Sequence, residues 1–175
     1  MGMRDEVFLQ ICKQTHGHPN IANCKEGWNL MIICLMSFPP SKNIKIRDYL
    51  SKALKTSSSP EIKERAELAF VLLDVIEEHG ERVEPPPEEE IEAVRQLKLI
   101  ELKVLTPDNK TVSIKVDPFT TVAEAEQMLN RHMKIRFTHA FGLFEANKEC
   151  EDVLSVKRRI MDVVASWRPS EDEDD

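Results

Sequence analysis

Glycine, cysteine and long hydrophobic runs are all scarce in this sequence of 175 residues. Its five glycines do not gather into a loop of the kind that cradles a nucleotide phosphate. The longest apolar stretch, around residues 30–38, is far shorter than the roughly 20 residues that cross a bilayer, so membrane contact is expected only indirectly. The start of the chain lacks the basic and apolar regions of a signal peptide, and the four cysteines are expected as free thiols in the cytoplasm.

Positive charge is also in deficit, because 31 acidic and 24 basic residues leave a net charge of −7. This balance argues against nucleic-acid binding through bulk electrostatics. Two acidic runs hold much of the excess, at residues 88–90 and 171–175, and residues 169–175 are expected to form a disordered acidic tail. Hydrophobic residues still make up 41% of the chain, which is enough to bury a core.

A run of three prolines followed by three glutamates, at residues 85–90, divides the sequence. Proline lacks a backbone donor and disfavours helix in the residue before it, so the run is typical of a junction between two folded units. The sequence therefore predicts a helical unit, a linker with a short helix, a second unit and the acidic tail. Their expected bounds are residues 1–84, 85–97, 98–168 and 169–175.

The first unit shows the period of amphipathic helices throughout. Val7, Phe8 and Ile11 share one face of the first helix, and the second helix is apolar nearly all round, which predicts that it is buried. Pro60 at the first turn and Gly80 after the last turn fit the usual start and stop of the fourth helix. The expected helices cover residues 4–15, 25–36, 44–54 and 59–79.

The second unit changes to the alternating pattern of β-strands over residues 99–106 and 112–116, which a polar turn joins, and this predicts a β-hairpin. Residues 121–124 then form a capping box that opens a helix ending near Met133. A short apolar strand is expected over residues 140–144. Hairpin, helix and strand in this order open a β-grasp, ubiquitin-like fold, so the chain is expected to be α+β, with an all-α bundle first.

A set of motifs in the first unit resembles the later part of the myosin tail homology 4 domain. They are an Arg-Asp-Glu string, a glutamine later in the same helix, a Gly-Trp pair and a Phe-Pro-Pro string. The residues that the resemblance implies to be a structural motif are Arg4, Asp5, Glu6, Gln10, Gly27, Trp28, Phe38, Pro39 and Pro40. Residues 99–167 resemble the first, ubiquitin-like lobe of a FERM domain.

This resemblance groups the chain with the tails of unconventional myosins, plant-type kinesins and related scaffold proteins. It implies a non-catalytic, cytoskeleton-associated protein-interaction module that binds cargo or adaptor proteins, with microtubule contact in some members and no cofactor. Two departures accompany it, because the helical domain begins part-way through and the lobe is expected to lack its last strand. The alternative is therefore a truncated structural fragment with no independent activity.

One segment of the first unit is strongly basic and contains a single acid, Asp48. Three of its lysines fall on the face of the third helix opposite its apolar residues. We interpret the segment as a docking surface for an acidic partner such as the tails of tubulin, and the alternative is an ordinary solvated helix face. The candidate partner-binding residues are Lys42, Lys45, Arg47, Lys52 and Lys55.

Cys12, His16, His18 and Cys24 have residue types that bind zinc, but structural zinc sites favour more closely spaced cysteine pairs. Cys12 also falls on the apolar face of its helix, where a free thiol packs as a small hydrophobic group. No serine or cysteine carries the flanking pattern of an activated nucleophile. Neither a metal site nor enzyme activity is expected.

Overall fold

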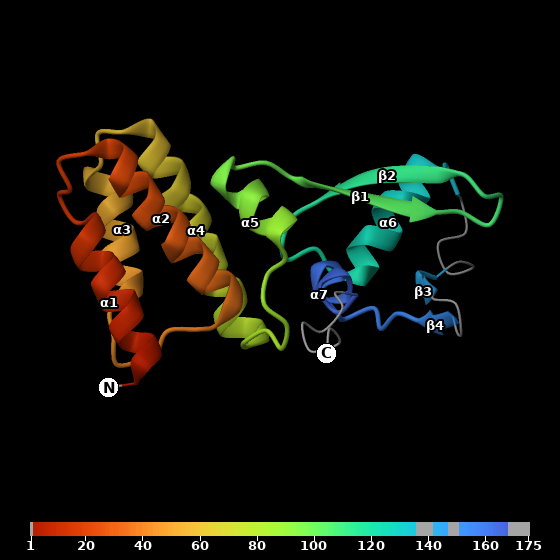
Figure 1. Cartoon of the computed structure of the whole chain (residues 1–175), viewed down its shortest axis with the longest axis horizontal. Helices are drawn as coiled ribbons and strands as arrows, with labels where there is room; N and C mark the ends of the chain where they lie inside the picture. Colours follow the sequence, from red (N-terminus) through yellow and green to blue (C-terminus); the bar gives the residue numbers. More distant parts are fainter. Residues whose placement is uncertain (1, 136–141, 147–150, 168–175) are drawn as a thin grey trace, which may run out of the picture. The chain divides into compact units, whose positions relative to one another are not determined.

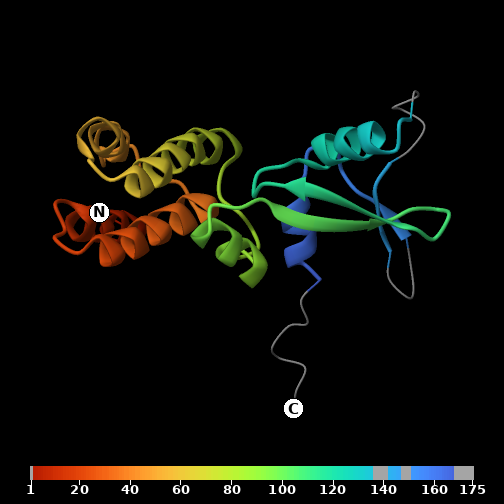
Figure 2. The ribbon, with the colours of Figure 1, turned by 90° about the horizontal axis from the view of Figure 1, so that it is seen from above.

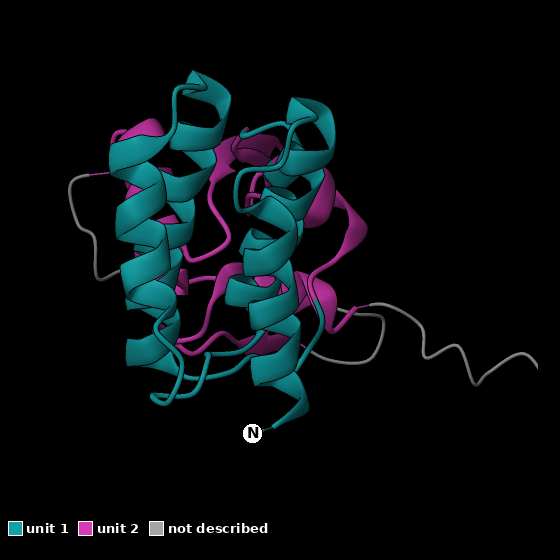
Figure 3. Cartoon of the chain, turned by 90° about the vertical axis from the view of Figure 1, so that its left-hand side faces the viewer, with its two compact units in different colours: residues 1–85, 94–97 teal, residues 86–93, 98–175 magenta. Residues whose placement is uncertain are grey.

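The computed structural model describes residues 2–135, 142–146 and 151–167 of the chain. It divides the chain into two units, which Figure 3 shows in different colours. Unit 1 consists of Met1–Pro85 and Val94–Leu97, and unit 2 consists of Pro86–Ala93 and Lys98–Asp175. The predicted acidic tail lies outside the described residues.

Unit 1 contains α1 (Met3–Thr15), α2 (Ile21–Ser37), α3 (Ile46–Thr56) and α4 (Pro60–His79). Helix α2 packs against both α1 and α4, and α3 packs against α4 (Figure 1). Seen from above, α1 and α2 lie on one side of this unit and α3 and α4 on the other (Figure 2). Helix α2 buries most of its apolar residues against these two neighbours, but Leu30 is 48% exposed, so the expectation of a buried helix holds for part of its surface only.

The core of unit 1 is built from large side chains that are almost completely buried. Phe8 and Leu35 have no exposed surface, and Trp28 is 1% exposed. Burying a side chain of this size contributes roughly 1.5–3 kcal/mol. Val7, expected on the same face of α1 as Phe8, is 37% exposed, because the face that packs on one neighbouring helix is narrower than the predicted apolar set.

Helix α2 begins four residues earlier than its apolar pattern predicts. The reason is Asn20, whose side chain accepts a hydrogen bond of 3.2 Å from the backbone N–H of Asn23 and so caps the helix. The sequence pattern places Asn20 at the end of the segment that separates the first two helices, and it does not predict that Asn20 caps α2. Helix α4 begins at Pro60 and ends before Gly80, whose φ of 79° suits glycine, so its predicted bounds are confirmed within a residue.

Unit 2 begins at Pro86, includes α5 (Glu88–Arg95) as far as Ala93, and resumes at Lys98 with a hairpin of β1 (Ile100–Leu105) and β2 (Thr111–Val116). The strands pair antiparallel from Ile100 opposite Val116 to Leu105 opposite Thr111, and this confirms the predicted hairpin. Further along lie α6 (Val122–His132), a second antiparallel pair of β3 (Phe144–Ala146) and β4 (Glu151–Val153), and α7 (Ile160–Ala165). In the described part of unit 2 both sheets have two strands.

Helix α6 covers the hairpin and starts at the predicted capping box. The Thr121 hydroxyl accepts a hydrogen bond from the Glu124 N–H, and the Glu124 carboxylate accepts one from the Thr121 N–H. Beneath the helix, Val122, Ala125 and Leu129 pack into an aliphatic cluster with both strands and α7. The α+β fold class that the sequence predicts is thus confirmed.

The strand expected over residues 140–144 is placed differently. Residues 140 and 141 lie outside the described residues, and β3 begins only at Phe144, which is 55% exposed rather than buried. The Leu143 N–H donates to the Glu126 carboxylate of α6 at 3.1 Å. The Leu143 backbone is therefore tied to α6 before the strand starts, and the described part of the apolar run, residues 142–144, is not a buried strand.

Candidate partner-binding surface

The motif residues of unit 1 meet in the structure although the sequence separates them widely. The carboxylate of Asp5, near the start of α1, accepts hydrogen bonds from the N–H of Ser41 at 3.0 Å and from its hydroxyl at 2.7 Å. Ser41 follows directly after Phe38, Pro39 and Pro40, so this contact fastens the turn after α2 to the start of α1. The hydrogen bonds from Ser41 lower the pKa of Asp5, which is 6% exposed.

Aromatic and cationic contacts reinforce the same junction. The ring of Phe38 packs edge-on against Phe8, with 5.6 Å between the ring centroids. The Arg4 guanidinium lies 5.2 Å from the centroid of Phe38 and also pairs with Glu81 at the end of the unit. On the exposed side of α1, Gln10 donates a hydrogen bond to the carboxylate of Glu6. The contacts of Asp5 and Phe38 thus join α1 to the end of α2, whereas Arg4, Glu6 and Gln10 are exposed.

The second motif, Gly27 and Trp28, lies where α1, α2 and α3 come together. A Cβ atom on Gly27 would stand 2.5 Å from the Cγ2 atom of Thr15, so only glycine lets α1 end this close to α2. The Thr15 hydroxyl donates to the Ile11 carbonyl at 2.7 Å and lies 2.6 Å from the hydroxyl of Tyr49. The ring of Tyr49 in turn stacks on Trp28, with 5.8 Å between centroids.

A further cluster in unit 1 has no counterpart among the expected site residues. The buried Arg65 of α4 donates to the side chain of Asn29 at 2.8 Å, to the Glu61 carbonyl at 3.2 Å and to the Arg95 carbonyl at 2.9 Å. A buried guanidinium needs such acceptors because its desolvation is costly. The sequence could have predicted that Arg65 is buried, because it falls in the apolar stripe of α4 between Ile62 and Ala69.

The basic segment divides into two parts in the structure. Lys45, Lys52 and Lys55 lie on one side of α3, because they are seven and three residues apart along a helix of 3.6 residues per turn. Together with Lys42 in the preceding loop, these lysines are exposed, and none has an ion pair with another described residue. They form the lysine face, the name used below for Lys42, Lys45, Lys52 and Lys55.

Arg47 does not belong to this face. Its guanidinium pairs with Asp74 at 2.6 Å and with Glu77 at 2.7 Å, both on α4, and lies 5.3 Å from the centroid of Phe70. Hydrogen bonds to these two carboxylates raise the pKa of Arg47. The residue therefore joins α3 to α4 inside unit 1, and its charge is already balanced. The sequence groups Arg47 with the lysines only because it lies in the same basic segment.

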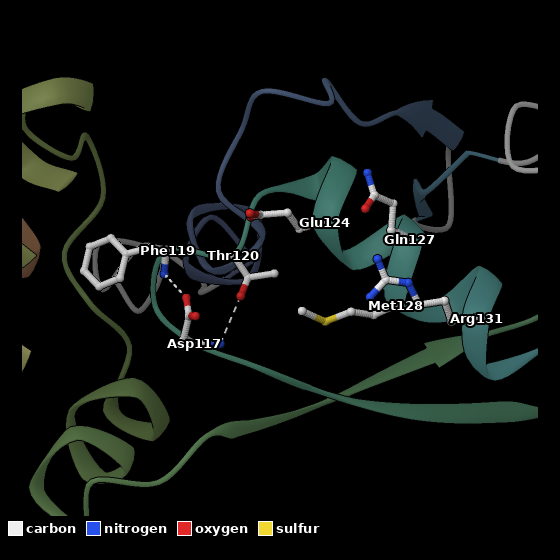
Figure 4. A pocket seen from close by; sticks show the side chains of 7 residues that line it. All are labelled: Asp117, Phe119, Thr120, Glu124, Gln127, Met128 and Arg131. Carbon is white, nitrogen blue, oxygen red and sulfur yellow. Dashed lines mark hydrogen bonds between the residues drawn. The ribbon is translucent and has the colours of Figure 1, made fainter. Parts of the chain in front are cut away.

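A pocket of about 340 Å³ in unit 2 lies between α6 and the segment before it (Figure 4). Two carboxylates, Asp117 and Glu124, line it, with Arg131 further along the helix. Asp117 accepts a hydrogen bond from the Phe119 N–H at 2.8 Å, and Glu124 completes the capping box with Thr121. Both carboxylates thus serve the local turn and the helix start, which accounts for their positions without a ligand.

The cysteines offer no activated nucleophile among the described residues. Burial raises the pKa of both Cys12 and Cys34 to about 11, so these thiols stay protonated at neutral pH. The thiol of Cys24 contacts the carbonyl of Thr15 at 3.6 Å, within the core. Across the described ranges, no three His, Cys, Asp or Glu side chains are grouped so as to hold a metal ion.

A helix long and apolar enough to cross a membrane is also missing from the described part of the chain. Residues 1–93, more than half of the chain, match the family model described as the MyTH4 domain. The chain belongs to the MyTH4 domain family. After the MyTH4 match, residues 98–175 match a second family model, the RA like domain. The resemblance to a myosin tail homology 4 domain followed by an ubiquitin-like lobe is therefore confirmed.

Relatives of this MyTH4 chain occur among motor proteins of plants and animals. Kinesin-like protein KIN-14I of Oryza sativa subsp. japonica is 34% identical over 154 residues, which cover 83% of this chain and 12% of that protein. Unconventional myosin-VIIb of Mus musculus is 31% identical over 144 residues, covering 81% of this chain and 6% of that protein. The MyTH4 chain thus spans only a small part of the length of these relatives.

Solved structures share the fold of this MyTH4 chain. The myosin VII MyTH4-FERM MF1 domain of Dictyostelium discoideum matches 94% of this chain with a TM-score of 0.85 at 21% identity, over 34% of that chain. The human myosin 7b C-terminal MyTH4-FERM domain, in complex with the harmonin-a PDZ3 domain, matches 94% of this chain with a TM-score of 0.72 at 22% identity, over 34% of that chain. At these identities the likeness is one of fold.

Proposed function

We propose that this MyTH4 chain is a non-catalytic protein-interaction module of a cytoskeletal motor or scaffold tail, which acts in the cytoplasm. The observation that carries the proposal is the lysine face, whose exposed cations form no ion pair with another described residue although the chain as a whole is acidic. Relatives named as kinesin-like proteins and unconventional myosins support this class of parent protein. A MyTH4-FERM domain of similar fold has been solved with a protein partner, the harmonin-a PDZ3 domain.

The lysine face fits a partner with an acidic surface, and we propose the acidic tails of tubulin as that partner. Single exposed lysines are ordinary on protein surfaces, but several on one side of a short helix produce a local positive potential. This potential attracts an acidic segment over a distance of about 10 Å at an ionic strength of about 0.1 M, and added salt shortens that distance. Binding through the lysine face is therefore expected to weaken steeply as salt increases.

Microtubule co-sedimentation of the whole chain tests this proposal. The variant Lys45→Glu/Lys52→Glu/Lys55→Glu reverses the charge on the lysine face, and we expect its affinity to fall by about tenfold or more. A matched control is Lys103→Glu/Lys115→Glu/Lys134→Glu, which makes the same change of charge on exposed residues of unit 2. The control is expected to bind within about threefold of the wild type.

Two outcomes would contradict the proposal. Equal loss of binding in both triple variants would mean that net charge, rather than the lysine face, governs the interaction. Wild-type chain that stays in the supernatant at low salt would remove tubulin as the partner. Microtubules whose acidic tails have been cleaved by protease supply the complementary test, because binding through these tails is expected to disappear with them.

A further inference from the structure

The helical bundle of unit 1 has a pocket of about 310 Å³ at the end where α1 and α3 finish and α2 and α4 begin. This end is uppermost in Figure 1, opposite the labelled N-terminus. We call it the helix-end pocket and define it by its lining residues Ile21, Cys24, Trp28, Tyr49, Lys52 and Ala53, with the loop of residues 57–59 at its edge. The functional roles described so far do not use this pocket.

The floor of the helix-end pocket is apolar and rigid. Trp28 is 1% exposed and stacks on Tyr49, and Cys24 and Ile62 are also buried. The hydroxyl of Tyr49 is held by Thr15, so the ring has a defined position. A preformed apolar floor of this kind is where the anchor side chain of a partner peptide contributes most of its binding energy.

The rim of the pocket is polar and lacks negative charge. Hydroxyl groups of the loop at residues 57–59 stand at the edge, and no lining residue carries a carboxylate. Lys52 lines the pocket directly, is exposed, and has no ion pair with another described residue. Because Lys45 and Lys55 share its side of α3, the lysine face runs up to the mouth of the pocket.

Ile21 adds an apolar surface at the same mouth. It is the first residue of α2, lines the pocket, and is 52% exposed. An exposed isoleucine beside a buried aromatic floor extends the apolar contact outward, toward the position where a bound chain would leave the pocket. The volume is at the small end of the range for ligand pockets, which suits one bulky side chain rather than a cofactor.

From this combination we propose that the helix-end pocket takes the bulky apolar side chain of an acidic peptide, whose neighbouring carboxylates contact Lys52 and the lysine face. The occupant is therefore a peptide segment with one aromatic or branched aliphatic residue next to a run of Asp or Glu. This inference rests on the proposed function, because it names the pocket in which the partner is anchored. It adds a specificity that charge alone does not supply, since acidic segments without the apolar residue bind more weakly.

Peptide binding to the whole chain tests the pocket through its own tryptophan. The sequence has two tryptophans, so in a Trp167→Phe background the emission reports Trp28 in the pocket floor. The probes are three short synthetic peptides: one phenylalanine followed by glutamates, alanine in place of that phenylalanine, and glutamines in place of the glutamates. We expect the first peptide to shift the emission and to bind at least about tenfold more tightly than either of the others.

Variants with matched controls locate the binding. Ala53→Leu fills the pocket from α3, and we expect it to lower the affinity for the first peptide by about tenfold. Ala22→Leu, on the exposed start of α2, is the control and is expected to keep that affinity within about twofold of the wild type. Lys52→Glu is expected to lower the affinity for the same peptide by about fivefold or more. The control Lys13→Glu, on α1, is expected to lower it by no more than about twofold. If Ala53→Leu fails to fold, Ile21→Glu serves instead, because it places a carboxylate on an exposed residue of the rim.

Each outcome decides the proposal. Equal binding of the phenylalanine and alanine peptides, or of Ala53→Leu and Ala22→Leu, would show that the pocket is not used. Equal binding of the glutamate and glutamine peptides would make the site a general apolar one, of the kind that takes an acyl chain, and would overturn the acidic occupant. If microtubule binding depends on the lysine face while no peptide binds, the pocket fails and the proposed function stands. If the peptide binds in the pocket while microtubules do not bind, tubulin is excluded as the partner and the proposal for the pocket stands.

Discussion

Several polar side chains in unit 1 join segments 30 or more residues apart in the sequence, whereas most of those in the described part of unit 2 bond to near neighbours. Asp5 holds Ser41, and Arg65 holds Asn29, in both cases across 36 residues. In unit 2, by contrast, Thr121 bonds to Glu124 across three residues to open α6. Unit 2 is therefore specified largely by local patterns, while the bundle of unit 1 depends on contacts that exist only once it is folded.

The aromatic residues show the same difference. Trp28 of unit 1 is 1% exposed, but Trp167 of unit 2 is 55% exposed and donates a hydrogen bond to Glu145. The cluster of unit 2, between the hairpin, α6 and α7, is built from aliphatic side chains such as Ile114, Leu129 and Met161. Equal substitutions in the two units should consequently have very different costs.

The largest expected effect compares the two tryptophans directly. Trp28→Ala removes a buried side chain and leaves a cavity, so we expect it to lower the free energy of unfolding by about 3–5 kcal/mol. Trp167→Ala removes an exposed side chain and is expected to cost about 0.5 kcal/mol or less. Urea unfolding followed by far-ultraviolet circular dichroism measures both. Similar values for the two variants would break the contrast between the units.

A smaller effect is expected where α1 approaches α2. Gly27→Ala places a methyl group against Thr15, and overpacking of this kind costs about 1–3 kcal/mol, which exceeds the roughly 0.5–1 kcal/mol that alanine gains in a helix. Thr15→Ser removes the opposing methyl group and keeps the hydroxyl that contacts Tyr49. The double variant is therefore expected to be more stable than Gly27→Ala alone. A strictly additive double-mutant cycle would contradict this account.

In unit 2 the corresponding test is the helix cap. Thr121→Ala removes the hydroxyl that receives the Glu124 N–H, and loss of such a cap typically costs about 1 kcal/mol. Thr111→Ala, on an exposed position of β2, is the matched control, since that threonine does not cap a helix. The measurement is again urea unfolding. A cost equal to that of the control would mean that α6 is held by its apolar face alone.

The smallest effect concerns pH and returns to unit 1. Because Ser41 lowers the native pKa of Asp5 below its ordinary value of 3.8, this carboxylate stabilises the fold above that pH and loses its contribution as pH falls through the native pKa. We expect Asp5→Asn to lose less stability than the wild type between about pH 5 and pH 2. Glu6→Gln, on the exposed side of the same helix, removes a carboxylate without touching Ser41. An equally flat pH profile for this control would show that Asp5 has no special role.

Much of the fold was predictable because its signals are local. The alternation of β1 and β2, the capping box at Thr121 and the proline and glycine at the ends of α4 all lie within one element. The start of α2 was missed because Asn20 is equally suited to a turn and to a helix cap. The strand near Phe144 was misplaced because its apolar composition does not reveal that Leu143 is tied to Glu126. The predicted domain bounds remain predictions.

The candidate site was less predictable than the fold. Three lysines were placed on one face of the third helix from their spacing, but Arg47 was added to the candidate residues because it lies in the same basic segment. The structure pairs Arg47 with Asp74 and Glu77 of another helix. The helix-end pocket has no sequence pattern, because its lining comes from the ends of four different helices. Neither the pairing of Arg47 nor the pocket depends on neighbours in the chain, so neither was visible in the sequence.

The sequence by itself determined the α+β class, the type of the elements from α1 to α6 and the family resemblance, because period, caps and turns act over a few residues. Only the tertiary structure decided which side chains meet across the bundle. In the folded chain Asp5 contacts Ser41, and Arg47 pairs with Asp74 instead of joining the lysine face. Lys52 lines a pocket that Trp28 also lines. The physical reason is that contacts between different helices form only when the folded chain brings their side chains together. The local sequence pattern of one helix does not show which residues of another helix it will contact.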